Sequence, residues 1–250
     1  MLQDPYFWAA AIPAVVMVGL SKGGLGPLGT LAVPILSLVI SPVQAAGLTL
    51  PIFVASDVIA VIAYRRQFDA AVLKAMLPAA ILGIVVGWLA AAWVSDDAVR
   101  LIVGAVSVLF ALNYWLRTRH ALEPSRPSKA RGAVWGAVSG FTSFVSHSGG
   151  PPFQMYALTL RLAPPVFAGT SVIFFAVVNA LKLIPYFFLG QFRAANLEAA
   201  AILAPLSIAC ALLAVRLVRV IDQALFYRLI YLLMFLLGLF LIGQAAVDLV

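Results

Sequence analysis

The sequence predicts an all-α polytopic membrane protein built from two inverted repeats, each a broken, re-entrant helical hairpin followed by three transmembrane helices. Of its 250 residues, 64% are hydrophobic and only 10% are charged, whereas a soluble domain has about 25% charged residues. The apolar residues fall in runs of about 20, the length that crosses a hydrocarbon core of about 30 Å. The same order of segments, a broken apolar stretch followed by three apolar spans, also occurs twice. This combination does not fit a soluble α/β domain.

Each half of the chain opens with a broken apolar stretch and continues with three apolar spans. The first stretch, residues 5–40, is interrupted by a Gly- and Pro-rich segment at 21–27; the second, residues 132–162, is interrupted at 146–152. Stretches of this length suit two half-helices better than one clean span. Full spans are expected at 43–64, 71–94, 98–117, 164–190, 195–216 and 222–248.

The register of the motifs predicts an internal duplication. We expect a first repeat over 1–120, a basic cytoplasmic linker over 121–131 and a second repeat over 132–250, together forming one integral membrane domain. At an offset of 125, Ser21 matches Ser146, Gly24 matches Gly149, Pro27 matches Pro152 and Lys22 falls on His147. At an offset of 122, Ala46-Gly47 matches Ala168-Gly169, Tyr64 matches Tyr186 and Asp57 falls on Asn179.

The distribution of Lys and Arg predicts the orientation of the spans. Loops 65–74, 117–131 and 216–228 are rich in basic residues, whereas loop 190–195 has only Arg193. Basic loops stay in the cytoplasm, so span 43–64 ends inside and its counterpart 164–190 ends outside. The repeats are therefore expected to be inverted, with both chain ends outside, in a multi-pass protein of the cell inner (cytoplasmic) membrane.

Charge and cysteine usage exclude several partners. The net charge of +7 lies in short loops and forms no basic tail or stripe, so the positive-inside bias explains it better than nucleic-acid binding. The single cysteine, Cys210, excludes an intramolecular disulfide and a cysteine metal cluster. The first residues, Met1–Asp4, contain no basic side chain, so we do not expect a cleaved signal peptide. We expect no metal and no cofactor. The expected partners are the lipid bilayer and a small anionic substrate, with a homo-oligomer left open.

The two Gly-rich breaks are candidates for an anion-binding site. Irregular backbone at membrane depth is tolerated where it lines a protein-enclosed cavity, and the N-terminus of a half-helix attracts anions. Paired breaks in corresponding positions of two halves are typical of a transporter's binding site. Small residues that allow close helix packing are the alternative explanation for the glycines. The candidate residues are Ser21, Lys22, Gly23, Gly24 and Gly26 in the first break, and Ser146, His147, Gly149 and Gly150 in the second.

Polar residues inside the spans extend this candidate site. Asn179 and Lys182 are three residues apart and share one helix face. Asp57 lies within its span and serves either to pair with Lys22 or Lys182 or to couple protons to transport. His147 is either a satisfied core histidine or a proton-coupling group, since an imidazole can titrate near neutral pH.

These motifs resemble the TauE/SafE family of sulfite exporters and related organosulfur-anion permeases. The resemblance rests on Gly19–Pro27 followed by Ala45-Ala46-Gly47, and on His147-Ser148-Gly149-Gly150-Pro151-Pro152 followed by Asn179 and Lys182. It covers essentially the whole chain. It implies an inner-membrane permease for sulfite, sulfoacetate, thiosulfate or a similar anion, driven by a proton or ion gradient. Cys210 lies outside these motifs, so a relay through cysteine is not expected.

Three functions remain open at this point. The leading hypothesis is a secondary transporter that alternates access to a central anion site. A passive anion channel could use the same residues. A remote alternative is an intramembrane hydrolase using Ser143 or Ser146 with His147, but the chain has no Gly-x-Ser-x-Gly elbow. We therefore expect a transporter and not an enzyme.

Overall fold

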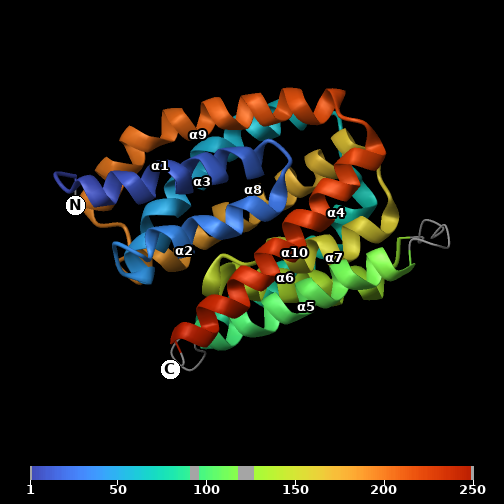
Figure 1. The fold of residues 1–250 in the computed structure, drawn as a ribbon, viewed down its shortest axis with the longest axis horizontal. Helices are drawn as coiled ribbons and strands as arrows, with labels where there is room; N and C mark the ends of the chain where they lie inside the picture. Colours follow the sequence, from blue (N-terminus) through green and yellow to red (C-terminus); the bar gives the residue numbers. More distant parts are fainter. Residues whose placement is uncertain (1, 91–95, 118–126, 249–250) are drawn as a thin grey trace. The chain divides into compact units, whose positions relative to one another are not determined.

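The computed structural model describes residues 2–90, 96–117 and 127–248, and every regular element in these ranges is a helix (Figure 1). α5 (Asp96–Arg117) contains a shorter apolar stretch, Leu101–Leu112. The chain is an all-α, multi-pass membrane protein. Six of the described helices are long and apolar enough to cross a membrane: α1 (Pro5–Lys22), α3 (Pro42–Tyr64), α4 (Ala70–Ala90), α8 (Pro164–Phe188), α9 (Ala194–Val220) and α10 (Gln223–Asp248).

The predicted spans correspond to α3, α4, α5, α8, α9 and α10, with ends that differ by a few residues. The end of the predicted span 71–94 and most of the predicted linker 121–131 lie outside the described residues. Local signals set several helix starts. Ser41 and Gln44 form a capping box at α3, and the side chains of Asp4 and Ser128 cap α1 and α6. Such caps satisfy the amide groups that a helix start leaves open.

Each broken stretch folds as a hairpin with a long first arm and a short second arm. In the first hairpin, α1 has 18 residues and is followed by the short helices η1 (Gly26–Leu31) and α2 (Ala32–Leu36), which pack back against it. In the second, α6 (Lys129–Ser146) also has 18 residues and is followed by α7 (Gly150–Ala157) and η2 (Leu158–Leu160). The second arm is the shorter one in both hairpins, so neither break divides its stretch into equal half-helices.

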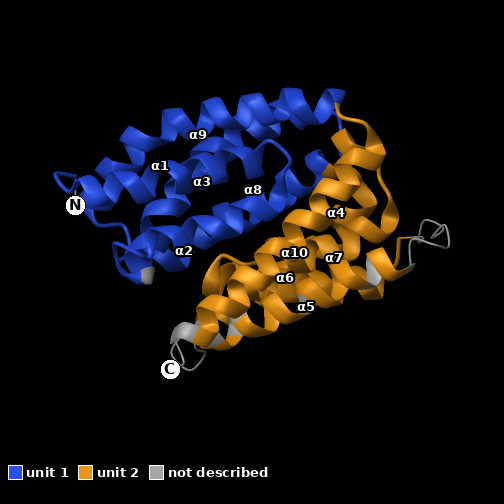
Figure 2. Cartoon of the chain, in the orientation of Figure 1, with its two compact units in different colours: residues 1–68, 168–220 blue, residues 69–167, 221–250 orange. Residues whose placement is uncertain are grey.

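The chain forms two compact units, which do not coincide with the two predicted repeats (Figure 2). Unit 1 comprises Met1–Phe68 and Ala168–Val220; unit 2 comprises Asp69–Phe167 and Ile221–Val250. In unit 1 the hairpin helix α1 packs on α9, and in unit 2 the hairpin helix α6 packs on α4. Each hairpin thus packs on the penultimate helix of the other predicted repeat. The inverted orientation of the repeats stays a prediction.

Small residues allow these two helix pairs to approach closely. A Cβ atom at Gly19 of α1 would lie 2.3 Å from the backbone oxygen of Ser207 in α9. In unit 2, a Cβ atom at Gly140 of α6 would lie 2.1 Å from the backbone oxygen of Ala80 in α4. The hydrophobic effect does not drive helices together in lipid. Close backbone approach of this kind allows the van der Waals contacts that hold them instead.

Candidate functional site

A buried cluster of charged side chains in unit 1 is the most unusual feature of the described residues. Lys22 is the last residue of α1, and Asp57 lies in α3; their side chains approach to 2.6 Å between Lys22 Nζ and Asp57 Oδ1. Lys22 is 5% exposed and Asp57 is 4% exposed. Buried charges persist only where partners compensate for lost hydration. Of the two lysines considered from the sequence as partners of Asp57, Lys22 forms the ion pair.

Helix α8 completes the cluster. Asn179 donates a hydrogen bond through Nδ2 to the second carboxylate oxygen of Asp57, at 2.8 Å. Lys182, one turn further along α8, is fully buried and interacts electrostatically with both Lys22 and Asp57. The two carboxylate oxygens of Asp57 therefore have different partners, an ammonium group and an amide.

Aromatic rings face both ammonium groups. Lys22 Nζ lies 4.8 Å from the centroid of the Phe53 ring, and Lys182 Nζ lies 5.9 Å from that of Tyr186. The face of an aromatic ring stabilises a cation without presenting a formal negative charge. The cluster thus contains two lysines and one aspartate, with further stabilisation from uncharged groups.

The first break is held in place by Tyr64, at the end of α3. Its hydroxyl donates to the carbonyl oxygen of Gly23 at 2.6 Å, which pairs a backbone group that no helix satisfies. Gly24 has a φ of 121°, a conformation that favours glycine. A Cβ atom there would also lie 2.7 Å from Cβ of Ala168. Gly26 begins η1, with Pro27 in its first turn.

The second break, in unit 2, is closed by hydroxyl groups of its own hairpin. Ser139 Oγ donates to the carbonyl of Gly149 at 2.7 Å, and Thr142 Oγ1 lies 3.2 Å from that of Ser148 and 2.9 Å from that of Val138 in its own helix. His147 is 7% exposed and caps α6 with a positive φ of 54°. Gly150 begins α7, with Pro151 in its first turn.

The two predicted hydroxyl donors are turned toward their own helices. Ser21 Oγ donates to the carbonyl of Val18 at 2.8 Å, and Ser146 Oγ donates to that of Thr142 at 3.3 Å. This back-bonding to the preceding turn is common for Ser in apolar helices. In this conformation both hydroxyl hydrogens are used within their own helices.

The structure thus brings part of the predicted site together. Lys22, Asp57, Asn179 and Lys182 form one cluster in unit 1, beside the break at Gly23 and Gly24. The residues of the second break, 146–150, belong to unit 2. Sequence reasoning missed Phe53 and the positioning roles of the Tyr64, Ser139 and Thr142 hydroxyls. Among the described residues, no group of three His, Cys, Asp or Glu side chains could hold a metal ion.

Comparison with protein families identifies the chain. The model of the family described as "Sulfite exporter TauE/SafE" matches residues 11–241. The chain belongs to this family. Searches of curated proteins and of solved structures returned no match. The matched region contains both breaks and the whole charged cluster. As a TauE/SafE protein, the chain is a membrane transporter, consistent with its six helices long enough to span a bilayer.

Proposed function

We propose that this TauE/SafE protein is a secondary transporter of a small sulfur-containing anion, such as sulfite, sulfoacetate or thiosulfate, in the cell inner membrane. The observation that carries the proposal is the buried cluster of Lys22, Asp57, Asn179 and Lys182 next to the first Gly-rich break. Ionisable groups within membrane spans are rare and usually mark a substrate or ion pathway.

The charge of the cluster favours an anionic substrate. With both lysines and the aspartate ionised, the cluster carries one net positive charge. This positive charge attracts a monoanion, whose oxygen atoms accept hydrogen bonds from ammonium groups as the Asp57 carboxylate does. Asp57 Oδ1, 2.6 Å from Lys22 Nζ, therefore occupies a position that a substrate oxygen would take.

This competition suggests how protons are coupled to transport. Protonation of Asp57 removes its negative charge and releases Lys22 for the substrate. A proton and an anion then bind together, and the net charge buried in the cluster stays the same as before binding. The proton and the anion consequently cross in the same direction. Asp57 thus has both of the roles considered for it: it pairs with Lys22 before binding and takes up the coupled proton when the anion binds.

Flux measurements in proteoliposomes test this mechanism. The full chain is reconstituted, the voltage is clamped at zero, and uptake of labelled sulfite is followed with and without a pH gradient. We expect sulfite to accumulate against its gradient only when the proton gradient drives it. In a second series a voltage is applied without a pH gradient; flux that follows this voltage, together with no response to the pH gradient in the first series, would instead indicate a passive channel.

An Asp57→Asn variant provides the matched control. It places an uncharged amide of the same shape at this position, which cannot take up or release a proton, so we expect sulfite counterflow to persist and proton-driven accumulation to disappear. Accumulation at the wild-type level in this variant would contradict the coupling role of Asp57. A thermal-shift screen against sulfite, thiosulfate, sulfoacetate, taurine, sulfate and small carboxylates would define the substrate.

The hydrolase alternative requires Ser146 or Ser143 to act as a nucleophile. Ser146 Oγ donates its hydrogen to the carbonyl of Thr142, whereas an activated serine donates to a base. Transport by a Ser146→Ala variant at the wild-type rate is expected under the transporter proposal.

A further inference from the structure

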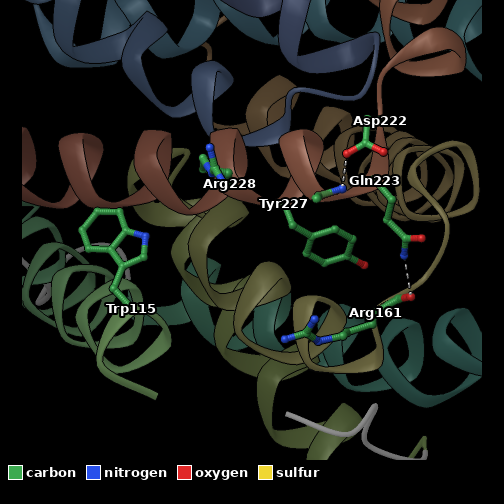
Figure 3. A pocket seen from close by; sticks show the side chains of 7 residues that line it. Trp115, Arg161, Asp222, Gln223, Tyr227 and Arg228 are labelled. Atoms are coloured by element: carbon green, nitrogen blue, oxygen red, sulfur yellow. Dashed lines mark hydrogen bonds between the residues drawn. The ribbon is translucent and has the colours of Figure 1, made fainter. Parts of the chain in front are cut away.

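A cavity lined by charged and aromatic side chains lies in unit 2, and none of its lining residues belongs to the charged cluster. Its volume is about 790 Å³, far larger than a single small oxyanion requires. It is formed by the end of α5, the residue that follows η2 and the first turns of α10 (Figure 3). Its lining residues are Trp115, Arg161, Asp222, Gln223, Ala224, Tyr227 and Arg228.

Arg161 is held in this wall in an unfavourable backbone conformation. Its φ of 49° and ψ of 42° are left-handed, a conformation that strains a residue with a Cβ atom and costs glycine little. Two hydrogen bonds from α10 fix the segment. Gln223 Nε2 donates to the carbonyl of Arg161 at 3.3 Å (Figure 3), and the Tyr227 hydroxyl donates to that of Leu162 at 2.8 Å. A strained arginine at a cavity indicates a role for its side chain.

The charged groups of the lining favour an anion. Arg161 and Arg228 supply two guanidinium groups, whereas Asp222 is the only acidic residue among the described residues of the lining. One oxygen of its carboxylate accepts hydrogen bonds from the backbone N–H groups of Ala224 and Leu225, at 2.8 and 3.1 Å. Asp222 therefore serves as the cap of α10. Guanidinium groups bind phosphate oxygens with two parallel hydrogen bonds.

The surroundings of the cavity suit a lipid. The loops next to it are predicted to be cytoplasmic, and Trp115 and Tyr227 are residue types that gather at the membrane interface. Leu225, Arg228, Leu232 and Leu236 recur at helical spacing along α10, so Arg228 stands near the end of one apolar stripe. These three leucines are 45%, 40% and 52% exposed. An acyl chain along the stripe would place a headgroup near Arg228.

We propose that this cavity binds the phosphate-bearing headgroup of an anionic membrane lipid, with Arg161 and Arg228 contacting its phosphate oxygens. Basic pockets between transmembrane helices on the cytoplasmic side bind lipid headgroups by this chemistry. This lipid site shares no residue with the charged cluster in unit 1. It does not depend on which substrate that cluster binds.

Lipid retention by the full chain in a neutral detergent tests the proposal. The protein is titrated with dioleoyl phosphatidylglycerol or dioleoyl phosphatidylcholine, and bound lipid is counted by native mass spectrometry. The variants are Arg161→Gly and Arg228→Gln. The control is Arg216→Gln, which removes an exposed arginine of unit 1 at the same predicted side of the membrane. Thermal unfolding without added lipid is measured for each.

We expect wild type and Arg216→Gln to bind phosphatidylglycerol at least tenfold more tightly than phosphatidylcholine, and each cavity variant to lose at least tenfold in affinity for phosphatidylglycerol. Arg161→Gly relieves the left-handed strain, so its unfolding temperature without lipid should equal or exceed that of wild type while binding is lost. Equal affinity for the two lipids, or wild-type binding in both cavity variants, would overturn the proposal. Displacement of the lipid by equimolar sn-glycerol 3-phosphate would assign the site to a soluble phosphate compound and overturn the lipid.

Discussion

The ion pair between Lys22 and Asp57 makes a strong prediction about stability, because removing one partner leaves the other buried and uncompensated. At 2.6 Å and an effective dielectric constant of about 20, the attraction is about 6 kcal/mol, which offsets the lost hydration of both groups. Breaking such a pair from one side costs about 3–5 kcal/mol. Lys22→Met and Asp57→Asn are therefore each expected to lower the unfolding temperature by roughly 10 °C.

The double variant separates pairing from other effects of these substitutions. In Lys22→Met/Asp57→Asn no charge of the pair remains, so we expect a loss no larger than that of either single variant, and a coupling energy of about 3 kcal/mol or more. Lys74→Met, at an exposed lysine of α4, is the control and should change stability by less than about 0.5 kcal/mol.

Two measurements on the same samples complete the experiment. Thermal unfolding in detergent gives the stability, and calorimetric titration with sulfite gives the affinity. We expect the double variant to regain stability but to bind no sulfite, because Lys22 is absent. A double variant destabilised by the sum of the two single losses would refute the pairing. Sulfite binding at wild-type affinity would refute the role of Lys22 in the site.

Three other substitutions test the remaining parts of the site. Lys182→Ala should weaken sulfite binding at least tenfold in the same titration, and unchanged affinity would remove Lys182 from the site. His147→Asn should alter the pH dependence of sulfite flux more than the affinity; identical pH profiles would exclude a coupling role. Gly24→Ala should cost about 2–4 kcal/mol in thermal unfolding, because a positive φ is combined with a Cβ only 2.7 Å from that of Ala168. Gly190→Ala is its control: φ is also positive, at 64°, but no atom lies within 4 Å of the added Cβ, so the loss should stay near 1 kcal/mol. Equal losses at the two glycines would contradict the close packing at Gly24.

Hydrophobic runs and the Gly- and Pro-rich breaks between them were sufficient to predict the helices. Apolar length determines a span directly, and the breaks at 21–27 and 146–152 fall where α1 and α6 end. The packing partners of each helix were not predictable, because helices that are apolar all round carry no amphipathic stripe that points to a neighbour. Close contacts of glycines such as Gly19 and Gly140 are the sequence signal that could have indicated them.

The candidate site was predictable in its intramembrane polar residues and its Gly-rich break, but not in the residues that support them. A lysine or aspartate in an apolar span is conspicuous, whereas Tyr64 and Thr142 are ordinary residues until the fold places them at a break. The Tyr64 hydroxyl reaches Gly23 across 41 positions of sequence, a contact that no local pattern encodes. Ser139 and Thr142 do have a local signal, since two hydroxyl residues one helical turn apart precede a Gly-rich break. They could have been predicted as groups that satisfy its carbonyls.

The hydrogen bond between Asn179 and Asp57 connects positions that the predicted duplication makes equivalent, 122 residues apart. Equivalent positions of two copies contact each other only at the axis that relates them. Two aspartates there would repel each other, whereas an aspartate and an asparagine form an acceptor and a donor. The basic residues differ in the same way, because the counterpart of Lys22 is His147 and that of Lys182 is Ala60. Under the predicted duplication, the two halves thus supply different polar groups to the cluster in unit 1, which makes the proposed anion site asymmetric.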